Sequence, residues 1–195
     1  MSPGCDVGED GGADQVQVFD TLGRETTSFS VGDAIEYLLV DEAGQLWAGY
    51  FDENPIGIRL WSAEGRLVWT SDGARIPGLF DCYALNVSGT VAWACPDMDF
   101  PLVEIRPDRG RTPYGAAHAV AVHGEQVAFY GGYGEEQGRL AYGELTATSV
   151  EPTAVGVLTL PDGTRPGHRR VVSRESRIYV QGEPFAAWHV FDLNG

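Results

Sequence analysis

The chain has 195 residues, a length typical of one large domain or two small ones. Its 13 basic and 28 acidic residues leave a formal net charge of −15, which argues against nucleic-acid backbones and anionic membrane surfaces and favours cations or basic partners. All 13 basic residues are Arg, so no Lys is available for Schiff-base chemistry or for a Walker-type phosphate loop.

Residues 1–14 combine four acids and four Gly with few apolar residues, so a disordered acidic leader is expected ahead of a single domain over 15–195. The leader lacks the basic and apolar regions of a signal peptide. Three Cys are too few for a disulfide framework. Together these features predict a protein of the reducing cytoplasm.

After residue 14 the chain consists of short apolar runs rich in Val, Ile, Tyr, Trp, Phe and Thr, which Gly, Asp, Asn and Pro interrupt. This pattern predicts β-strands joined by tight turns. Two strands are expected within 15–31. Four longer units follow, each opening with two strands around a tight turn, and each unit continues through a loop into further amphipathic strands. They begin at residues 35, 81, 117 and 169, and the third ends in a strand expected at 156–160.

With Trp47, Trp93 and Phe129 taken as equivalent, the units recur after 46 and then 36 residues, near the roughly 40–50 residues of propeller blades. If strands A to D run from the axis of a blade to its rim, the chain reads CD, ABCD, ABCD, ABCD, ABC. This predicts an all-β, β-propeller-like fold of about four to five four-stranded antiparallel blades. A β-sandwich or jelly roll is the competing fold. Either an N-terminal strand completes the last blade and closes a small ring, or the chain is an incomplete ring with exposed edges.

The segment 39–53, LVDEAGQLWAGYFDE, resembles the blade motif of bacterial propeller proteins in which a D-x-x-G turn precedes W-x-G-Y. With DCYALNV, WAC, FPLVEI and FYGGYGEE following in order, the chain is similar to one family of bacterial propeller-like repeat proteins that has no known activity. The resemblance extends over 33–192 and implies a fold only. The chain departs from the family at Asn54 and Pro55, which follow the acids of FDENPIG, and in its short N-terminal part.

The loops after strand B are acidic in three units. They carry Asp52 and Glu53, Asp97 and Asp99, and Glu135 and Glu136. The repeat offsets place Glu53, Asp99 and Glu135 at equivalent positions around one mouth of a propeller. Because several carboxylates can hold Ca²⁺ or another divalent cation, these loops are the candidate site for a cation or a basic partner. The alternative is that they are solvated turns of an acidic protein.

The same offsets align Glu36, Cys82 and His118 at the start of strand A, and His168 comes next in the fourth unit. These are metal-ligating residue types, and zinc prefers nitrogen and sulfur donors. No local spacing such as C-x-x-C accompanies them. The competing interpretation is ordinary packing between blades.

Cys82 and Cys95 lie on the two strands of one hairpin. If Ser88 and Gly89 are its two turn residues, the cysteines face each other within reach of a disulfide. If a three-residue loop holds Gly89 in the left-handed position, the cysteines are offset by one residue. The remaining interpretation is two buried apolar thiols without a bond.

The sequence therefore favours a non-enzymatic propeller-type binding or scaffold module that uses its acidic loop face. One alternative is a lactonase-like hydrolase that depends on Ca²⁺, although its ligand set is not recognisable. The other is a segment of a larger propeller sensor assembly. The expected partners are a protein or a small-molecule ligand, and self-association is expected if the ring is incomplete.

Overall fold

The computed structural model describes residues 15–51, 57–71, 81–96, 102–106, 109–111, 119–131, 138–147, 149–167 and 170–195. These residues form five antiparallel sheets of two, four, four, four and three strands. None of them belongs to a helix long and apolar enough to span a membrane.

Each sheet follows the chain in order, so that every strand pairs with the strand before or after it. The first sheet contains β1 (Val16–Phe19) and β2 (Glu25–Phe29). The second contains β3 (Ile35–Val40), β4 (Leu46–Tyr50), β5 (Ile58–Trp61) and β6 (Leu67–Thr70). The third contains β7 (Cys82–Ser88), β8 (Val91–Pro96), β9 (Val103–Arg106) and β10 (Arg109–Arg111). The fourth contains β11 (Ala119–His123), β12 (Gln126–Tyr130), β13 (Arg139–Leu145) and β14 (Val150–Val157). The fifth contains β15 (Arg170–Arg174), β16 (Arg177–Gln181) and β17 (Trp188–Asp192).

The core lies between successive sheets, because alternate residues of one strand point to opposite faces. On β7, for example, Leu85 packs towards the second sheet and Ala84 towards the fourth. Both faces of the third and fourth sheets are therefore buried, which explains the nearly continuous apolar runs of their inner strands. The first sheet meets the second through a smaller cluster of Val16, Val31 and Leu46.

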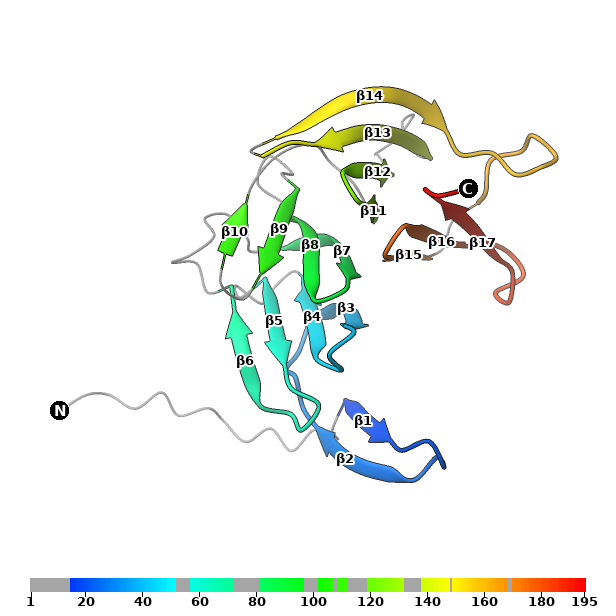
Figure 1. Ribbon diagram of the computed structural model, residues 1–195. Helices are drawn as coiled ribbons and strands as arrows, with labels where there is room; N and C mark the ends of the chain where they lie inside the picture. Colours follow the sequence, from blue (N-terminus) through cyan, green and yellow to red (C-terminus); the bar gives the residue numbers. More distant parts are fainter. Residues whose placement is uncertain are drawn as a thin grey trace.

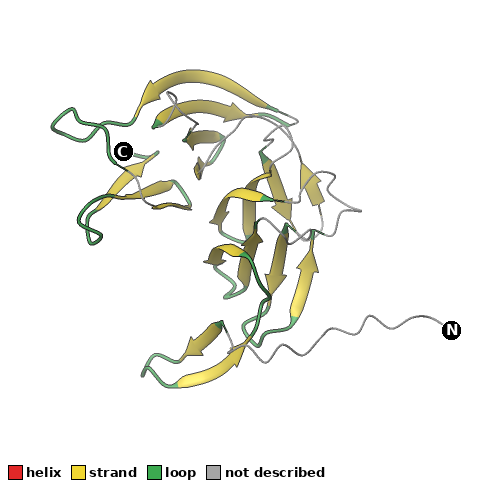
Figure 2. Cartoon of the chain, turned by 180° about the vertical axis from the view of Figure 1, so that it is seen from behind, coloured by secondary structure: helices red, strands yellow, loops and turns green. Residues whose placement is uncertain are grey.

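The sheets are arranged as the blades of an arc, with the inner strands at its concave side (Figure 1). Figure 2 shows the same arc from behind, with β1 and β2 at one end and the last sheet at the other. The predicted strand order CD, ABCD, ABCD, ABCD, ABC is confirmed, and so is the all-β propeller-like fold. The ring is not closed, so the small closed ring is not the arrangement that the chain adopts.

Two details of the strand assignment were wrong. The last strand of the fourth sheet is β14, Val150–Val157, and not the predicted 156–160. Pro152 has no backbone donor, and β14 accommodates it because this strand pairs only with β13 among the described strands. In addition, Trp47 and Trp93 pack towards the following sheet, whereas Phe129 packs towards the preceding one. The alignment of the third unit was therefore shifted by one residue, which exchanges the two faces.

Candidate functional site

The inner strands of four sheets meet at the concave side of the arc. Strand β7 contacts β3, β11 and β15, and β11 also contacts β15. We call the region formed by these four strands and by the turns that follow them the axial hub. Strand β7 of the third sheet therefore contacts the inner strands of the second, fourth and fifth sheets.

Asn86 holds the axial hub together from the middle of β7. Its side chain is fully buried, and Nδ2 donates to the carbonyl oxygens of Val120 and Glu175, both at 2.7 Å. Its Oδ1 has no hydrogen-bond partner among the described residues. One amide group thus joins three sheets that lie far apart in the sequence.

Two further contacts complete this network. The Ser173 hydroxyl oxygen accepts a hydrogen bond from Val120 N at 2.9 Å, and the Glu175 carbonyl also accepts one from Val122 N at 2.9 Å. Glu175 N donates to the Val87 carbonyl at 3.3 Å, and the Glu175 backbone has a positive φ of 51°. A non-glycine residue in that conformation is uncommon, and here it directs both backbone groups of Glu175 towards neighbouring strands.

The polar contacts of the axial hub involve neutral and charged groups. Asn86 and Ser173 bond to backbone groups, and the Arg174 guanidinium donates to the Val40 carbonyl oxygen. The Glu175 side chain is exposed and lies 3.7 Å from Arg174. Within the described part of the chain no group of three or more His, Cys, Asp or Glu is placed to hold a metal ion. The hydrogen bonds of the hub join strands of four sheets, so the hub has the character of a structural junction.

The two cysteines of the third sheet are free and buried. The turn residues are Gly89 and Thr90, since Ser88 pairs with Val91, so neither predicted loop has the right residues. Gly89 does have the left-handed conformation of the second alternative, with a φ of 60°. A bulge next to Cys82 then pairs it with Pro96, whereas Cys95 pairs with Ala84. The two cysteines are not opposite each other, and no disulfide joins them.

Burial also determines the chemistry of these thiols. It raises the pKa of Cys95 to about 12. Burial raises the pKa of Cys82 well above its usual value as well, with a smaller contribution from the neighbouring Cys95. The thiolate is the form that attacks electrophiles and binds metals, so neither side chain is available for such a role near neutral pH.

The predicted ring of Glu36, Cys82, His118 and His168 is only partly within the described residues. Glu36 is exposed on β3, whereas Cys82 is buried against Gly49 and Tyr37. His118 and His168 lie outside the described residues. The two described members therefore have opposite environments, and a protonated thiol is a poor metal ligand.

The candidate acidic loops lie outside the described residues as well. This holds for all six predicted carboxylates: Asp52, Glu53, Asp97, Asp99, Glu135 and Glu136. Their role as a binding face stays a prediction.

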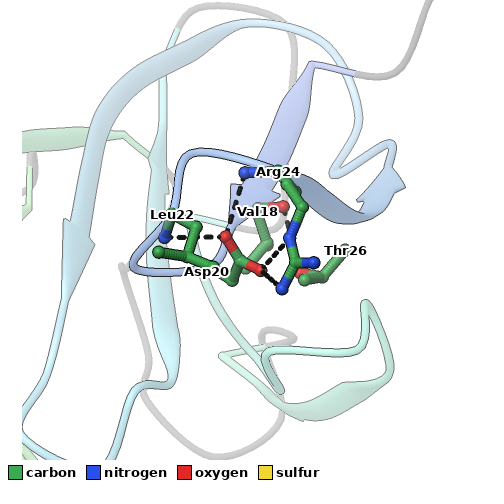
Figure 3. A network of polar contacts seen from close by, with 5 residues as sticks. All are labelled: Val18, Asp20, Leu22, Arg24 and Thr26. Carbon is green, nitrogen blue, oxygen red and sulfur yellow. Dashed lines mark hydrogen bonds and ion pairs between the residues drawn. The ribbon is translucent and has the colours of Figure 1, made fainter.

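A recurring turn was only partly recognised in the sequence. In the turn between β1 and β2, Asp20 Oδ1 accepts hydrogen bonds from Leu22 N and Arg24 N at 2.8 and 3.0 Å (Figure 3). Asp41 makes the corresponding bonds in the turn between β3 and β4, and its Oδ2 also accepts one from the Trp47 indole at 3.2 Å. A short polar side chain that satisfies the turn amides allows the same tight turn to recur.

Asn86, Ser173 and Glu175 are the described residues that the sequence analysis missed. The sequence analysis gave Asn86 no role beyond its place in the motif DCYALNV. The available signal was a polar residue inside an otherwise apolar run, CYALNV, because a buried amide needs hydrogen-bond partners that must come from other strands.

Comparison with known proteins gives the fold. The propeller-fold protein Hsv2 of Kluyveromyces lactis is similar with a TM-score of 0.54 over 91% of this chain and 55% of that chain, at 11% identity. Hsv2 of Kluyveromyces marxianus has the same TM-score and identity, with 91% and 53% covered. The chain has a β-propeller fold. It spans about half the length of the Hsv2 chains that it matches.

The other comparisons do not assign the chain to a family. AztD of Citrobacter koseri has a TM-score of 0.34 over 89% of this chain and 61% of that chain, at 12% identity. No family model and no curated protein matched the sequence.

Proposed function

We propose that this protein is a propeller-type binding module whose surfaces carry the function. The observation that supports this proposal is the axial hub. In it, Asn86 ties β7 to β11 and to the turn after β15, so the polar groups of the inner strands serve to join the sheets. A module of this kind presents loops and strand edges to a partner and needs no reacting group at its axis.

The charge of the chain specifies the class of partner. A net charge of −15 attracts cations and basic polypeptides and repels acidic ones. We therefore propose that the three acidic loops bind a divalent cation or a basic segment of a partner protein. Glu53, Asp99 and Glu135 represent the three loops in the test of this proposal, one carboxylate from each.

Calorimetric titration separates the two ligand classes. An oligolysine peptide and Ca²⁺ are titrated separately into the purified protein, at low and at high salt. Binding of the peptide that weakens strongly with salt supports a basic partner, because exposed charges are screened. Binding of Ca²⁺ that persists at high salt supports a cation site with several carboxylate ligands.

A matched pair of variants locates the binding face. The variant Glu53→Gln, Asp99→Asn, Glu135→Gln is expected to lose most of the binding. The control variant Glu25→Gln, Glu144→Gln, Glu151→Gln removes the same charge from exposed strand positions and is expected to retain it. Equal losses in the two variants would contradict the proposed face. Hydrolysis of a lactone that depends on Ca²⁺ would contradict a plain binding module and favour the hydrolase.

A further inference from the structure

One guanidinium of the second sheet lies between two aromatic rings and forms no ion pair. Arg59 is on β5, and its Cζ lies 5.6 Å from the centroid of the Tyr50 ring and 5.8 Å from that of the Trp61 ring. Among the described residues, no carboxylate is within ion-pair distance of this guanidinium. Four other described arginines do pair with carboxylates, namely Arg24, Arg106, Arg174 and Arg177.

The strand register explains why the Arg59 and Trp61 side chains share one face. Across β4 and β5, Trp61 lies opposite Leu46 and Arg59 lies opposite Ala48. Residues directly opposite in an antiparallel pair point to the same face of the sheet. Leu46 and Trp61 belong to the apolar cluster that joins the first and second sheets. Arg59 therefore points towards the contact between these two sheets.

Two hydrogen-bond donors at this contact are buried and have no acceptor. Arg59 Nε and Trp61 Nε1 both lack a partner among the described residues. The Tyr50 hydroxyl lies near both groups: burial raises the pKa of Tyr50, and the Trp61 indole and the Arg59 guanidinium oppose that shift. The same hydroxyl donates its proton to the Val31 carbonyl oxygen at 2.5 Å. Because buried polar groups are normally hydrogen-bonded, donors gathered in this way indicate an acceptor that the described chain does not supply.

The Arg59 guanidinium also borders a position that has no side chain. Arg59 as a whole is partly exposed, although its Nε is buried. Gly32, in the connection between β2 and β3, has a φ of +105°. A Cβ at Gly32 would lie 3.6 Å from Arg59 Nη1 and 3.8 Å from Tyr50 Cε1. A side chain longer than that of Ala would therefore compete for the space beside Nη1, which glycine leaves free.

We propose that Gly32, Tyr50, Arg59 and Trp61, which we call the Arg59 cluster, bind the carboxylate group of a small organic acid. A guanidinium can donate two parallel hydrogen bonds to a carboxylate, and the flanking rings hold it in position for that contact. The Trp61 indole supplies a further donor. The ligand is small and carries one negative charge, because the net charge of −15 repels polyanions and acidic macromolecules.

Nuclear magnetic resonance of the indole groups provides the test. Acetate is titrated into the full-length protein at constant ionic strength, and the Trp61 indole N–H signal is assigned by its loss in Trp61→Phe. Acetate is expected to shift this signal until the site is saturated. Acetamide, which has the same shape without the charge, and inorganic phosphate, which is tetrahedral, are each expected to shift it at least about fivefold less.

Substitutions of two arginines make the test specific. Arg59→Gln removes the guanidinium and is expected to abolish the saturable shift, and Arg59→Lys is expected to weaken binding at least about tenfold because Lys cannot donate the parallel pair. The control Arg66→Gln removes the same charge from an exposed position before β6 and is expected to bind acetate as the unmodified protein does. Circular dichroism verifies that each variant is folded.

A pair of glycine substitutions keeps every charged group in place and decides the matter if the Arg59 variants fail to fold. Gly32→Ala places a methyl group beside Arg59 Nη1 and is expected to weaken acetate binding at least about threefold. Gly44→Ala introduces a methyl group at a position that also has a left-handed φ, +75°, but has no atom within 4 Å of it. This control is expected to leave acetate binding unchanged.

Four results would overturn the proposal. They are the absence of a saturable acetate shift, an equal response to acetamide, a stronger response to phosphate, and equal losses in Arg59→Gln and Arg66→Gln. The variant Glu53→Gln, Asp99→Asn, Glu135→Gln is expected to bind acetate normally. Failure of this site is therefore distinguishable from failure of the acidic loops to bind their ligand.

Discussion

Asn86 illustrates how a single polar side chain determines the arrangement of several sheets. Its amide reaches backbone carbonyls of two other sheets, at 2.7 Å each, from a fully buried position. Because buried carbonyls need donors, an apolar side chain at this site would leave Val120 O without this partner. The geometry of the axial hub therefore depends on the chemistry of this residue more than on its size.

Replacing Asn86 tests that dependence. Asn86→Ala is expected to lower the free energy of unfolding by about 2–4 kcal/mol, because it removes two buried hydrogen bonds and leaves a cavity. The control Thr90→Ala, in the exposed turn at the end of β7, is expected to change it by less than about 0.5 kcal/mol. Urea unfolding followed by Trp fluorescence measures both values. Similar losses for the two variants would mean that the amide does not hold the hub.

The buried thiols provide a second prediction for single residues. Since burial raises the pKa of Cys95 to about 12 and also raises that of Cys82, both are expected to resist iodoacetamide near neutral pH and to react after unfolding. The unfolded chain loses these protons near the usual thiol pKa, whereas the folded chain keeps them. The two thiols therefore make their full contribution to the free energy of unfolding below about pH 8.5, and this contribution decreases as the pH rises above that value. Alkylation mapped by peptide mass spectrometry, and urea unfolding at several pH values, measure these effects. Rapid alkylation of Cys95 in the native protein would contradict this account.

At the scale of elements, turns determine how neighbouring sheets meet. Gly65, in the turn between β5 and β6, has a φ of +79°, and a Cβ there would lie 2.5 Å from Phe29 Cγ. The turn therefore packs directly on β2, so the first sheet is positioned partly by the absence of a side chain. Gly44 occupies the same place in the turn between β3 and β4, with a φ of +75°, but has no atom within 4 Å of its Cβ position.

This difference allows a controlled comparison. Gly44→Ala is expected to cost about 1 kcal/mol of stability from backbone strain alone. Gly65→Ala is expected to cost about 2–4 kcal/mol, since overlap with Phe29 is added to the same strain. Removing the ring by Phe29→Ala should recover the additional loss in a double-mutant cycle measured by urea unfolding. Equal costs at the two glycines would show that the contact with β2 does not matter.

The elements also show where sequence reasoning was sound and where it failed. The order of strands was predictable, because apolar runs and turn residues alternate along the whole chain. The faces of the strands were not, since a shift of one residue between the second and third units exchanges them, as Phe129 shows. The predicted pairing of Cys82 with Cys95 was wrong for a related reason, because a bulge changes the register without a clear signal in the sequence.

At the scale of the whole molecule, the open arc makes stability uneven. The third and fourth sheets have packed neighbours on both faces, whereas the first and last sheets end the arc and have one neighbour each. Apolar burial per strand is therefore greatest in the middle of the arc. Local opening should require the least free energy at its ends.

Hydrogen exchange of the free protein tests this gradient. Among the strands, amides of β1, β2 and β17 are expected to exchange fastest. Amides of β7, β8, β11 and β12 are expected to exchange slowest, with rates at least about 100-fold lower than those at the ends of the arc. The variant Asn86→Ala is expected to narrow this range by accelerating exchange in the hub strands. Uniform exchange in all five sheets would indicate a single cooperative unit and would contradict the gradient.

The sequence by itself determined the class of fold and the order of the described strands, because these follow from local patterns of apolar and turn-forming residues. It also determined the net charge of −15, on which the proposed class of partner rests. Only the tertiary structure decided the joining of distant strands by Asn86 and the burial of the two free thiols. Each of these depends on which strands of different sheets come into contact, and that information is not contained in the periodicity of any single strand.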